Sequence, residues 1–315
     1  MTRYVLRRLG LAIITLFILS VVVFLIASVL PGSVGRAILG PFAEQQSVDL
    51  LNAELGVDGP IIGRYLDWVG GALQGDFGDS YKFRAPVMDY VPTALWSSVK
   101  LAVMTLILVV PLGIIGGTVA ALRQGRASDR AITVTGLSLA VTPEFVIGIV
   151  LIVVFAVRLD WLPAGGSAKG SVVDQVKVLI LPSITLTAIL FGYLSRMARA
   201  GTIEALNADY TRTATLKGLP RRTVLRRHVL RNSLLPTIAV IATQMSYLLG
   251  GLLVTETLFN YRGLGLLIAE AANDRDVPML MGAVFIVGAL AMFFTLLADL
   301  TIAWLNPRVR LGARQ

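Results

Sequence analysis

The sequence predicts an all-α, polytopic membrane protein with six transmembrane helices in one domain, residues 1–315. Three observations support this prediction: the mean hydropathy is +0.77, only 15% of the 315 residues are charged, and the apolar residues gather in long runs. An α-helix rises about 1.5 Å per residue, so about 20 apolar residues cross the hydrocarbon core of a bilayer. This composition is typical of polytopic membrane proteins and places the chain outside the soluble globular class.

Six apolar runs are long enough, or nearly long enough, to cross a membrane. The first follows a basic N-terminus, but its 22 residues exceed the about 7–15 of a cleavable signal peptide, so we expect a retained span. The fourth has only 17 residues, and the aliphatic stems of Arg196 and Arg199 can extend it while their charges reach water. The expected spans are Leu9–Leu30, Leu101–Leu122, Ile132–Val157, Val178–Leu194, Leu234–Leu258 and Met279–Leu305.

The distribution of basic residues predicts the orientation of these spans. The N-terminus, the turn after the second span, residues 196–231 and the C-terminal tail hold 18 of the 28 Lys and Arg residues. The same segments contain only three acidic residues, Asp129, Glu204 and Asp209. Because cytoplasmic loops of membrane proteins are enriched in Lys and Arg, we expect both termini and residues 204–236 to be cytoplasmic.

The largest expected outer segment, residues 31–98, differs in charge and contains two helical patterns. It has four basic and eight acidic residues. In "AEQQSVDLLNAELGV", Val48, Leu51 and Leu55 fall on one helical face, and Gly56 suits a C-cap; in "IIGRYLDWVGGAL", the face consists of Ile62, Tyr65, Val69 and Leu73. We expect two short amphipathic helices that pack over the ends of the spans, with direct solute recognition as the alternative.

A basic segment follows the fourth span: "EALNADYTRTATLKGLPRRTVLRRHVLRNSLLP", Glu204–Pro236. We expect a helix to begin at Gly201 or Thr202, with Glu204 near its positive N-terminal end. The helix has to end at Leu219, because the residue before Pro220 is driven out of the α region, and a second basic helix then leads into the fifth span. Orientation alone explains the charge of this segment but leaves the Gly-Leu-Pro break without a reason.

The same segment closely resembles the coupling loop, or EAA segment, of membrane permeases in ATP-binding-cassette (ABC) importers of the dipeptide/oligopeptide type. The stretches "LPGSVGRAILGP", "YLDWVGGALQGDFGDSY", "TLFNYRGLGLLIAEAANDRDVPM" and "ADLTIAWLNPRVR" are also similar to that family. The resemblance covers nearly the whole chain, in order. Many members read Ala-Arg-Ala-Lys-Gly where this chain has Ala214–Gly218, so Thr215 and Leu216 depart from the family pattern.

The resemblance implies that residues 201–233 form a cytoplasmic coupling loop whose helix sits in a groove of a separate ATPase. A stiff helix between the fourth and fifth spans can pass a rigid-body movement of the ATPase into the membrane. Gly218 would permit close approach of the two backbones. The coupling residues implied in this way are Glu204, Ala205, Asp209, Tyr210, Arg212, Thr213, Ala214, Lys217 and Gly218.

The resemblance also implies an assembly and a location. A second, related permease would complete the pathway, two cytoplasmic ATP-binding subunits would supply energy, and an extracytoplasmic solute-binding protein would deliver di- or oligopeptides. Nickel, glutathione or another small solute is the alternative cargo, since relatives are used for these. Such a complex would lie in the bacterial or archaeal cytoplasmic membrane, within the lipid bilayer.

Several other classes of function are excluded or disfavoured by the residues themselves. The chain lacks the phosphate-binding pattern G-x-x-x-x-G-K-[ST], so we expect any ATP to be used by partner subunits; "GGSAKGS" at Gly165–Ser171 has its Lys before the last Gly. The chain has no Cys and only one His, His228, so we expect no metal site and no cofactor of its own. Basic residues form no stripe with interleaved aromatics, which argues against nucleic acid. With no catalytic constellation, we expect a non-catalytic subunit.

Three acidic residues in apolar runs keep an ion-coupled secondary transporter open as an alternative: Glu144, Glu256 and Asp299. Glu144 is the thirteenth of the 26 residues of the third span and is expected near mid-membrane. It is either a protonated or hydroxyl-bonded group, with Thr142 or Thr135 as its partner, or an acid of the translocation pathway that meets a cationic amino group of the solute. We expect Asp299 to pair with an Arg of the inner turns.

Overall fold

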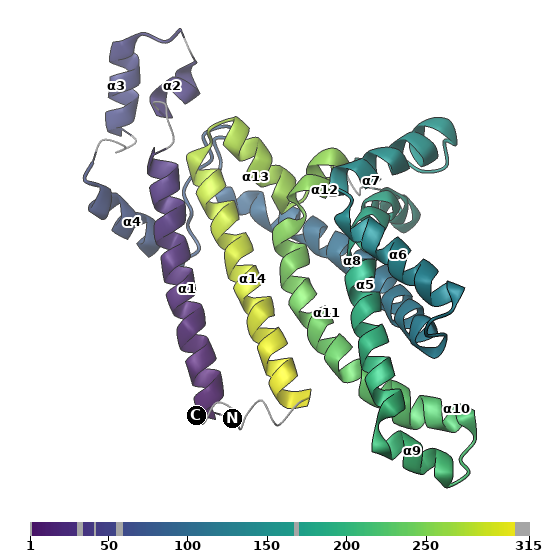
Figure 1. Ribbon diagram of the computed structural model, residues 1–315. Coiled ribbons are helices and arrows are strands. Elements are labelled where there is room, and N and C mark those ends of the chain that lie inside the picture. The colour runs from purple at the N-terminus through teal and green to yellow at the C-terminus, as the bar shows by residue number, and fades with distance from the viewer. Residues whose placement is uncertain (1, 30–33, 41, 55–58, 167–169, 306–315) are drawn as a thin grey trace.

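The computed structural model describes residues 2–29, 34–40, 42–54, 59–166 and 170–305, and it is helical throughout these ranges apart from turns and one isolated bridge between Asp79 and Pro86. The all-α prediction is therefore confirmed (Figure 1). The helices are α1 Thr2–Val29, α2 Val34–Leu39, α3 Gln45–Glu54, α4 Ile61–Leu73, α5 Val91–Leu122, α6 Ala127–Val141, α7 Glu144–Leu151, α8 Val172–Asn207, α9 Asp209–Leu216, α10 Arg221–Thr223, α11 Arg231–Gly251, α12 Leu253–Leu258, α13 Leu264–Asn273 and α14 Val277–Leu305, with a 3-10 turn at Val87–Asp89 and π-helical segments at Ile152–Arg158 and Val224–Leu230.

Within the described residues, four helices are long and apolar enough to cross a membrane: α1, α5, α8 and α14. A fifth span results if α6 and the helix that begins at Glu144 are counted together, although they meet at an angle of 103°. The expected fifth span, Leu234–Leu258, corresponds to α11 and α12, which are separate helices. Six spans therefore remain a prediction, while several membrane-spanning helices are established by length and composition.

The centre of the molecule is the packing of α5 against α8. Gly113 and Gly117 of α5 let the two backbones approach, because a Cβ atom at Gly113 would lie 2.6 Å from the Leu194 Cβ, and one at Gly117 would lie 2.3 Å from the Ser195 carbonyl oxygen. Large apolar side chains fill the space around this contact: Leu101, Val109, Leu179, Leu186, Leu190, Leu194, Leu248, Leu252 and Tyr261. This contact gives the molecule a tightly packed middle.

The two helices expected in the outer segment are present, and α4 coincides with "IIGRYLDWVGGAL". The face predicted for α4 is partly wrong, because Ile62 and Leu73 are 71% and 84% exposed. Instead, the ring of Tyr65 packs edge-on against Phe24 of α1, and the ring of Trp68 packs against the same Phe24 at a tilt. On α3, Val48 is fully buried as predicted, whereas Leu55 and Gly56 lie outside the described residues.

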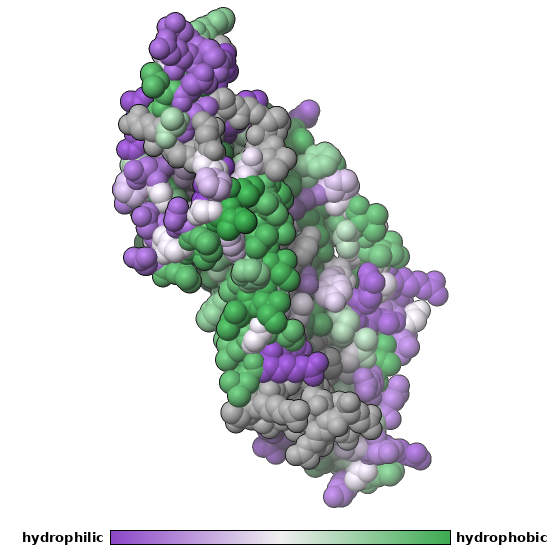
Figure 2. All heavy atoms as spheres, turned by 90° about the vertical axis from the view of Figure 1, so that its left-hand side faces the viewer, coloured by the Kyte–Doolittle hydropathy of each residue, from purple (hydrophilic) through white to green (hydrophobic). Residues whose placement is uncertain are grey.

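The molecule has two distinct ends. The start of α1, the end of α14 and the α9–α10 hairpin lie at one end, and α2, α3 and α13 lie at the other (Figure 1). On the face seen in Figure 2, apolar side chains form a band over the middle of the molecule, and hydrophilic ones gather above it. Helix α1 also exposes large apolar side chains, a surface suited to contact with lipid: Ile13, Ile14, Phe17 and Ile18.

Candidate functional site

The predicted coupling segment is a helical hairpin that projects beyond the end of α8. The expectation that a helix begins at Gly201 or Thr202 is wrong, because α8 continues without interruption to Asn207. A Cβ atom at Gly201 would lie 2.7 Å from the Ser233 carbonyl oxygen, and the Thr202 hydroxyl donates to the Ala198 carbonyl oxygen at 2.7 Å, so both residues belong inside a packed helix. Glu204 consequently lies in the last turn of α8, away from any helix N-terminus.

A short second helix, α9, follows after a break at Ala208, whose extended backbone (φ −74°, ψ 147°) interrupts the helical path. Its end has the hydrogen bonds of a Schellman motif. The Gly218 N–H donates to the Thr215 carbonyl oxygen at 3.0 Å, and the Leu219 N–H donates to the Ala214 carbonyl oxygen at 3.3 Å. Gly218 has φ +74°, which disfavours every residue with a side chain, and nothing lies within 4 Å of the place of its missing Cβ.

Small apolar side chains hold the hairpin together. Ala205, Ala214, Val224 and Val229 form a buried cluster between the end of α8, α9 and the π-helical segment that precedes α11. The Thr211 hydroxyl donates to the Ala205 carbonyl oxygen at 2.6 Å and fastens α9 to α8 across the break. Because α9 has only eight residues, this packing accounts for its stability better than helix propensity does.

The structure divides the nine predicted coupling residues into two groups. Ala205 and Ala214 are 3% and 4% exposed and face the interior of the hairpin, so they are not available to another protein. The exposed members are Glu204, Asp209, Tyr210, Arg212, Thr213, Lys217 and Gly218. Leu216, one of the two departures from the family pattern, is 79% exposed at the end of α9, and the sequence interpretation omitted it. The sequence did contain a signal for this exposed position, namely an apolar residue directly beside the charged Lys217.

Glu144 lies at a break between helices, so its expected place inside a continuous span is wrong. Pro143 (φ −56°, ψ 137°) precedes α7, and Glu144 is the first residue of that helix. Its carboxyl group accepts a hydrogen bond from the Thr255 hydroxyl of α12. The predicted partner Thr142 is engaged otherwise, because its hydroxyl donates to the Ser138 carbonyl oxygen at 2.8 Å. The structure thus shows Glu144 as a hydroxyl-bonded carboxyl group at a helix interface, as one of the two interpretations of the sequence expected, but its partner is Thr255 and not Thr142 or Thr135.

The neighbouring Glu256 has a structural role that the sequence did not reveal. It is fully buried, and its carboxyl group accepts hydrogen bonds from the Ser98 hydroxyl (2.5 Å), the Gly265 N–H (2.7 Å) and the Leu266 N–H (3.1 Å). The Ser98 hydroxyl oxygen in turn accepts from the Leu264 N–H at 2.8 Å. Glu256 of α12 therefore caps the N-terminus of α13 and joins it to α5.

Two ion pairs account for other charges near the ends of helices. Arg199 of α8 makes a bidentate contact with Asp129 of α6, with nitrogen–oxygen distances of 2.7 Å and 2.9 Å. Asp299 of α14 lies 2.8 Å from a nitrogen of Arg8 in α1, so its partner belongs to the N-terminal helix and the expected pairing with an Arg of an inner turn is wrong. Both pairs link helices that are distant in sequence.

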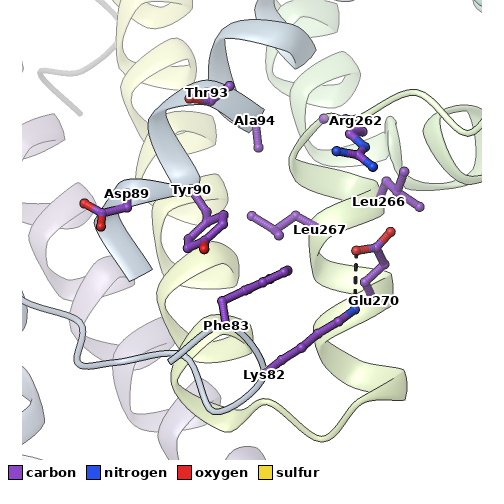
Figure 3. A pocket seen from close by; sticks show the side chains of 11 residues that line it. Lys82, Phe83, Asp89, Tyr90, Thr93, Ala94, Arg262, Leu266, Leu267 and Glu270 are labelled. Carbon is purple, nitrogen blue, oxygen red and sulfur yellow. Dashed lines mark ion pairs between the residues drawn. The ribbon is translucent and has the colours of Figure 1, made fainter. Parts of the chain in front are cut away.

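At the opposite end of the molecule, a cavity of about 450 Å³ opens between the start of α5, the preceding loop and α13 (Figure 3). Phe83 and Tyr90 stack in it with ring centroids 4.4 Å apart. Across from the stacked rings lie Arg262, which precedes α13, and Glu270, which belongs to the last turn of α13 (Figure 3). Among the described residues, no group of three or more His, Cys, Asp or Glu side chains is placed to hold a metal ion.

Known proteins match the chain over nearly its whole length. Residues 92–311 match the family described as binding-protein-dependent transport system inner membrane component, and residues 1–106 match the family of its N-terminal portion. The chain is also similar to the glutathione transport system permease protein GsiC of Escherichia coli (strain K12) and of Shigella dysenteriae serotype 1 (strain Sd197). Each is 36% identical over 313 residues, which cover 98% of this chain and 99% of the relative.

Two separate findings therefore agree on the same kind of protein. The helical membrane architecture carries an exposed hairpin where the coupling segment was predicted, and the family matches extend from residue 1 to residue 311. The identity to the permease relatives covers nearly all of both chains. The chain belongs to the family of binding-protein-dependent transport system inner membrane components, as an ABC importer permease of the dipeptide/oligopeptide type.

Proposed function

We propose that this permease forms half of the translocation pathway of an importer for short peptides and that its hairpin couples the pathway to a separate cytoplasmic ATPase. The observation that carries the proposal is the exposed α9 helix, which is fastened to α8 by the Thr211 hydroxyl and packs against the π-helical segment that leads into α11. Because α9, the end of α8 and the segment before α11 share one buried cluster, a push on α9 would move α8 and α11 together. The chain itself would be non-catalytic.

The proposed assembly follows from the family. A second, related permease, two cytoplasmic ATP-binding subunits and an extracytoplasmic solute-binding protein would complete the importer in a bacterial or archaeal cytoplasmic membrane. The start of α1, the end of α14 and the hairpin lie at one end of the molecule, which is consistent with cytoplasmic termini (Figure 1). In this proposal, residues 1–315 are a single permease domain, residues 31–98 lie outside and residues 201–233 face the ATPase.

We propose that the exposed side chains of the hairpin make the contact with the ATPase. Tyr210 and Leu216 are 41% and 79% exposed and offer apolar surface at the two ends of α9. The surrounding polar residues Glu204, Asp209, Arg212, Thr213 and Lys217 form a rim. Apolar anchors within a polar rim are typical of protein interfaces. The buried Ala205 and Ala214 would support this surface from inside.

We propose short peptides as the cargo, with glutathione as the specific alternative. Both cargoes have support, because the dipeptide/oligopeptide resemblance covers nearly the whole chain and the similar permeases are named for glutathione transport. Nickel and other small solutes form a third group. Glutathione is itself a small peptide, so one pathway chemistry suits the first two classes.

Uptake measurements test the proposed function directly. The gene for this chain is deleted, and uptake of labelled dipeptides, tripeptides, glutathione and nickel is compared with that of cells in which the chain is restored. We expect loss of peptide or glutathione uptake and rescue by the restored chain. Unchanged uptake of all peptides and glutathione, with loss of a chemically different solute, would contradict the cargo; unchanged uptake of every solute would contradict the function.

A further inference from the structure

The cavity at the outer ends of α5 and α13 has the dimensions of a small-molecule site. Its volume of about 450 Å³ lies within the about 300–1,000 Å³ typical of ligand pockets. Phe83, Tyr90 and Thr93 form one wall, and Arg262, Leu266 and Glu270 form the other (Figure 3). The cavity lies at the end of the molecule opposite the α9–α10 hairpin (Figure 1).

Two buried carboxyl groups fix the walls of this cavity. Asp276, which is 1% exposed, accepts hydrogen bonds from the N–H groups of Tyr81 (3.1 Å) and Lys82 (3.2 Å) and from the Ser80 hydroxyl, so it fixes the loop that carries Phe83. On the other side, Glu256 holds the first N–H groups of α13, as described above. Rigid walls favour binding because less conformational entropy is lost when the ligand enters.

The charges around the cavity are incompletely neutralised. No ion pair or side-chain hydrogen bond involves the Arg262 guanidinium among the residues that the structure describes. The Lys82 ammonium lies 2.6 Å from Asp274 but 3.9 Å from Glu270, and the hydrogen bond to Asp274 raises the pKa of Lys82. The close pair is thus Lys82–Asp274, and the Glu270 carboxylate keeps capacity for another cation.

The Arg262 guanidinium and the Glu270 carboxylate lie on either side of the apolar middle of the cavity. Glu270 follows Leu266 by one helical turn, about 5.4 Å, and Arg262 precedes Leu266 by four residues. Figure 3 shows Arg262 beside Ala94 and Glu270 at the opposite end, next to Lys82, with the stacked rings facing the space between. From one end of the cavity to the other, its walls therefore offer a positive group, an aromatic surface and a negative group.

We propose that this cavity binds a small zwitterion with an apolar side chain, of the dipeptide class, as a receiving site at the outer end of the permease. The Arg262 guanidinium would hold the carboxylate through two parallel N–H donors, and the Glu270 carboxylate would hold the ammonium group. The side chain would lie against Phe83 and Tyr90. Two extended residues span about 7 Å, which suits separated charges. This inference rests on the proposed function, because it assigns the outer cavity to the solute.

Protection of a single cysteine tests the proposal, since the chain has no cysteine of its own. Thr93→Cys places a thiol on the cavity wall, and its reaction with a maleimide is followed on the assembled transporter in nanodiscs, without binding protein. We expect the dipeptide Ala-Phe to slow labelling in a saturable way. The C-terminal amide and the N-acetyl derivative each lose one charged contact and should bind about tenfold more weakly. Ile62→Cys, on exposed α4, is the control thiol and should react at the same rate with and without dipeptide.

A charge variant then identifies the residue responsible. In the Thr93→Cys chain, Arg262→Gln should weaken the apparent affinity for Ala-Phe by about tenfold and abolish the preference over the amide. Arg275→Gln, an exposed residue beyond α13 and outside the cavity, is the matched control and should change neither. Retained preference in Arg262→Gln would overturn the assignment of the carboxylate contact.

The remaining outcomes separate the cavity from the proposed function. No protection by Ala-Phe, or equal protection by all three compounds, would overturn the proposed site. In a parallel assay with binding protein added, protection that appears only with the binding protein, with or without dipeptide, would also overturn the proposed site and would assign this surface to protein docking. Any of these results combined with lost uptake on deletion of the chain leaves the permease function intact, whereas the function itself fails only if deletion leaves uptake unchanged.

Discussion

Gly218 has a backbone conformation that explains its presence independently of any partner. Its positive φ closes α9 with a Schellman motif, and the space beside its Cα is open within this chain. The resemblance had assigned Gly218 to close approach of an ATPase. Both reasons can hold together, so a variant that adds bulk must be compared with one that adds only strain.

Substitution of Gly218 separates these two reasons. Gly218→Ala adds a Cβ at positive φ, which costs roughly 1 kcal/mol, and should reduce solute-stimulated ATP hydrolysis only in part. Gly218→Trp adds similar strain and a large ring, and it should abolish hydrolysis coupling because the ring would collide with the ATPase. The amount of each variant in the membrane is the control. Equal losses in both variants would show that the cap, and not close approach, is what coupling requires.

Glu144 provides a second prediction at the level of one side chain. If it lines the pathway, Glu144→Gln should change transport rate or solute preference, because the charge is removed while the amide oxygen can still accept a hydrogen bond from Thr255. Thr255→Val removes the same hydrogen bond and keeps the carboxyl group, so it serves as the matched variant. Uptake kinetics across peptides of different charge provide the measurement. Unchanged kinetics in Glu144→Gln would leave Glu144 with a structural role only.

The α9–α10 hairpin shows how one element combines an interior and an exposed surface. Its interior consists of Ala205, Ala214, Val224 and Val229, and its exposed tip includes Leu216. Replacement of an interior residue should disturb the fold of the hairpin, whereas replacement of an exposed one should disturb only binding. The family pattern alone groups Ala214 and its neighbours as one motif and does not make this distinction.

Two aspartate substitutions on α9 test this division. Ala214→Asp would bury an unpaired carboxylate, which is costly, so we expect a hairpin that is cleaved faster by protease and fails to associate with the ATPase. Leu216→Asp places the same charge in water and should keep protease resistance while weakening association. Limited proteolysis and co-purification are measured side by side. Protease resistance in Ala214→Asp would contradict the packing described here.

The capping of α13 by Glu256 leads to a prediction about stability. Glu256→Ala leaves two buried N–H groups and the Ser98 hydroxyl without their acceptor, each at about 1–3 kcal/mol, so the melting temperature of the purified chain should fall. Thr257→Ala on the same helix, whose hydroxyl is exposed and bonds only to the Leu253 carbonyl oxygen, should have little effect. A similar melting temperature for both variants would show that Glu256 is not needed as a cap.

The whole molecule has two distinct ends, and the predicted orientation, with the hairpin end inside the cell, can be tested with introduced thiols. Gln74→Cys, on the exposed end of α4, should react with a membrane-impermeant maleimide added to intact cells. Arg222→Cys, in the hairpin, should react only after the membrane is opened. The chain has no native cysteine, so each variant carries one thiol. The reverse pattern of labelling would contradict the orientation inferred from the basic residues.

Much of the architecture was predictable because its causes are local. Long apolar runs and short amphipathic helices at 45–54 and 61–73 follow from hydrophobicity and periodicity, whereas the helix expected to end at Leu219 ends at Leu216, because the Gly218 cap closes it before Pro220. The family resemblance also lay in contiguous stretches of sequence. These features depend on residues that are neighbours in the chain, so they can be read without any knowledge of tertiary contacts.

The features that were missed or wrong depend on residues far apart in sequence. The sequence placed Glu144 inside a straight span, yet the chain bends by 103° beside it, and its partner Thr255 lies 111 positions away. It also began a helix at Gly201, where packing against Ser233 keeps α8 intact. The sequence by itself determined the class of protein and the positions of most helices, because apolar runs and short motifs act locally. Only the tertiary structure decided which carboxyl groups are bonded, which motif residues are buried and where a cavity forms, since each results from contacts between distant segments.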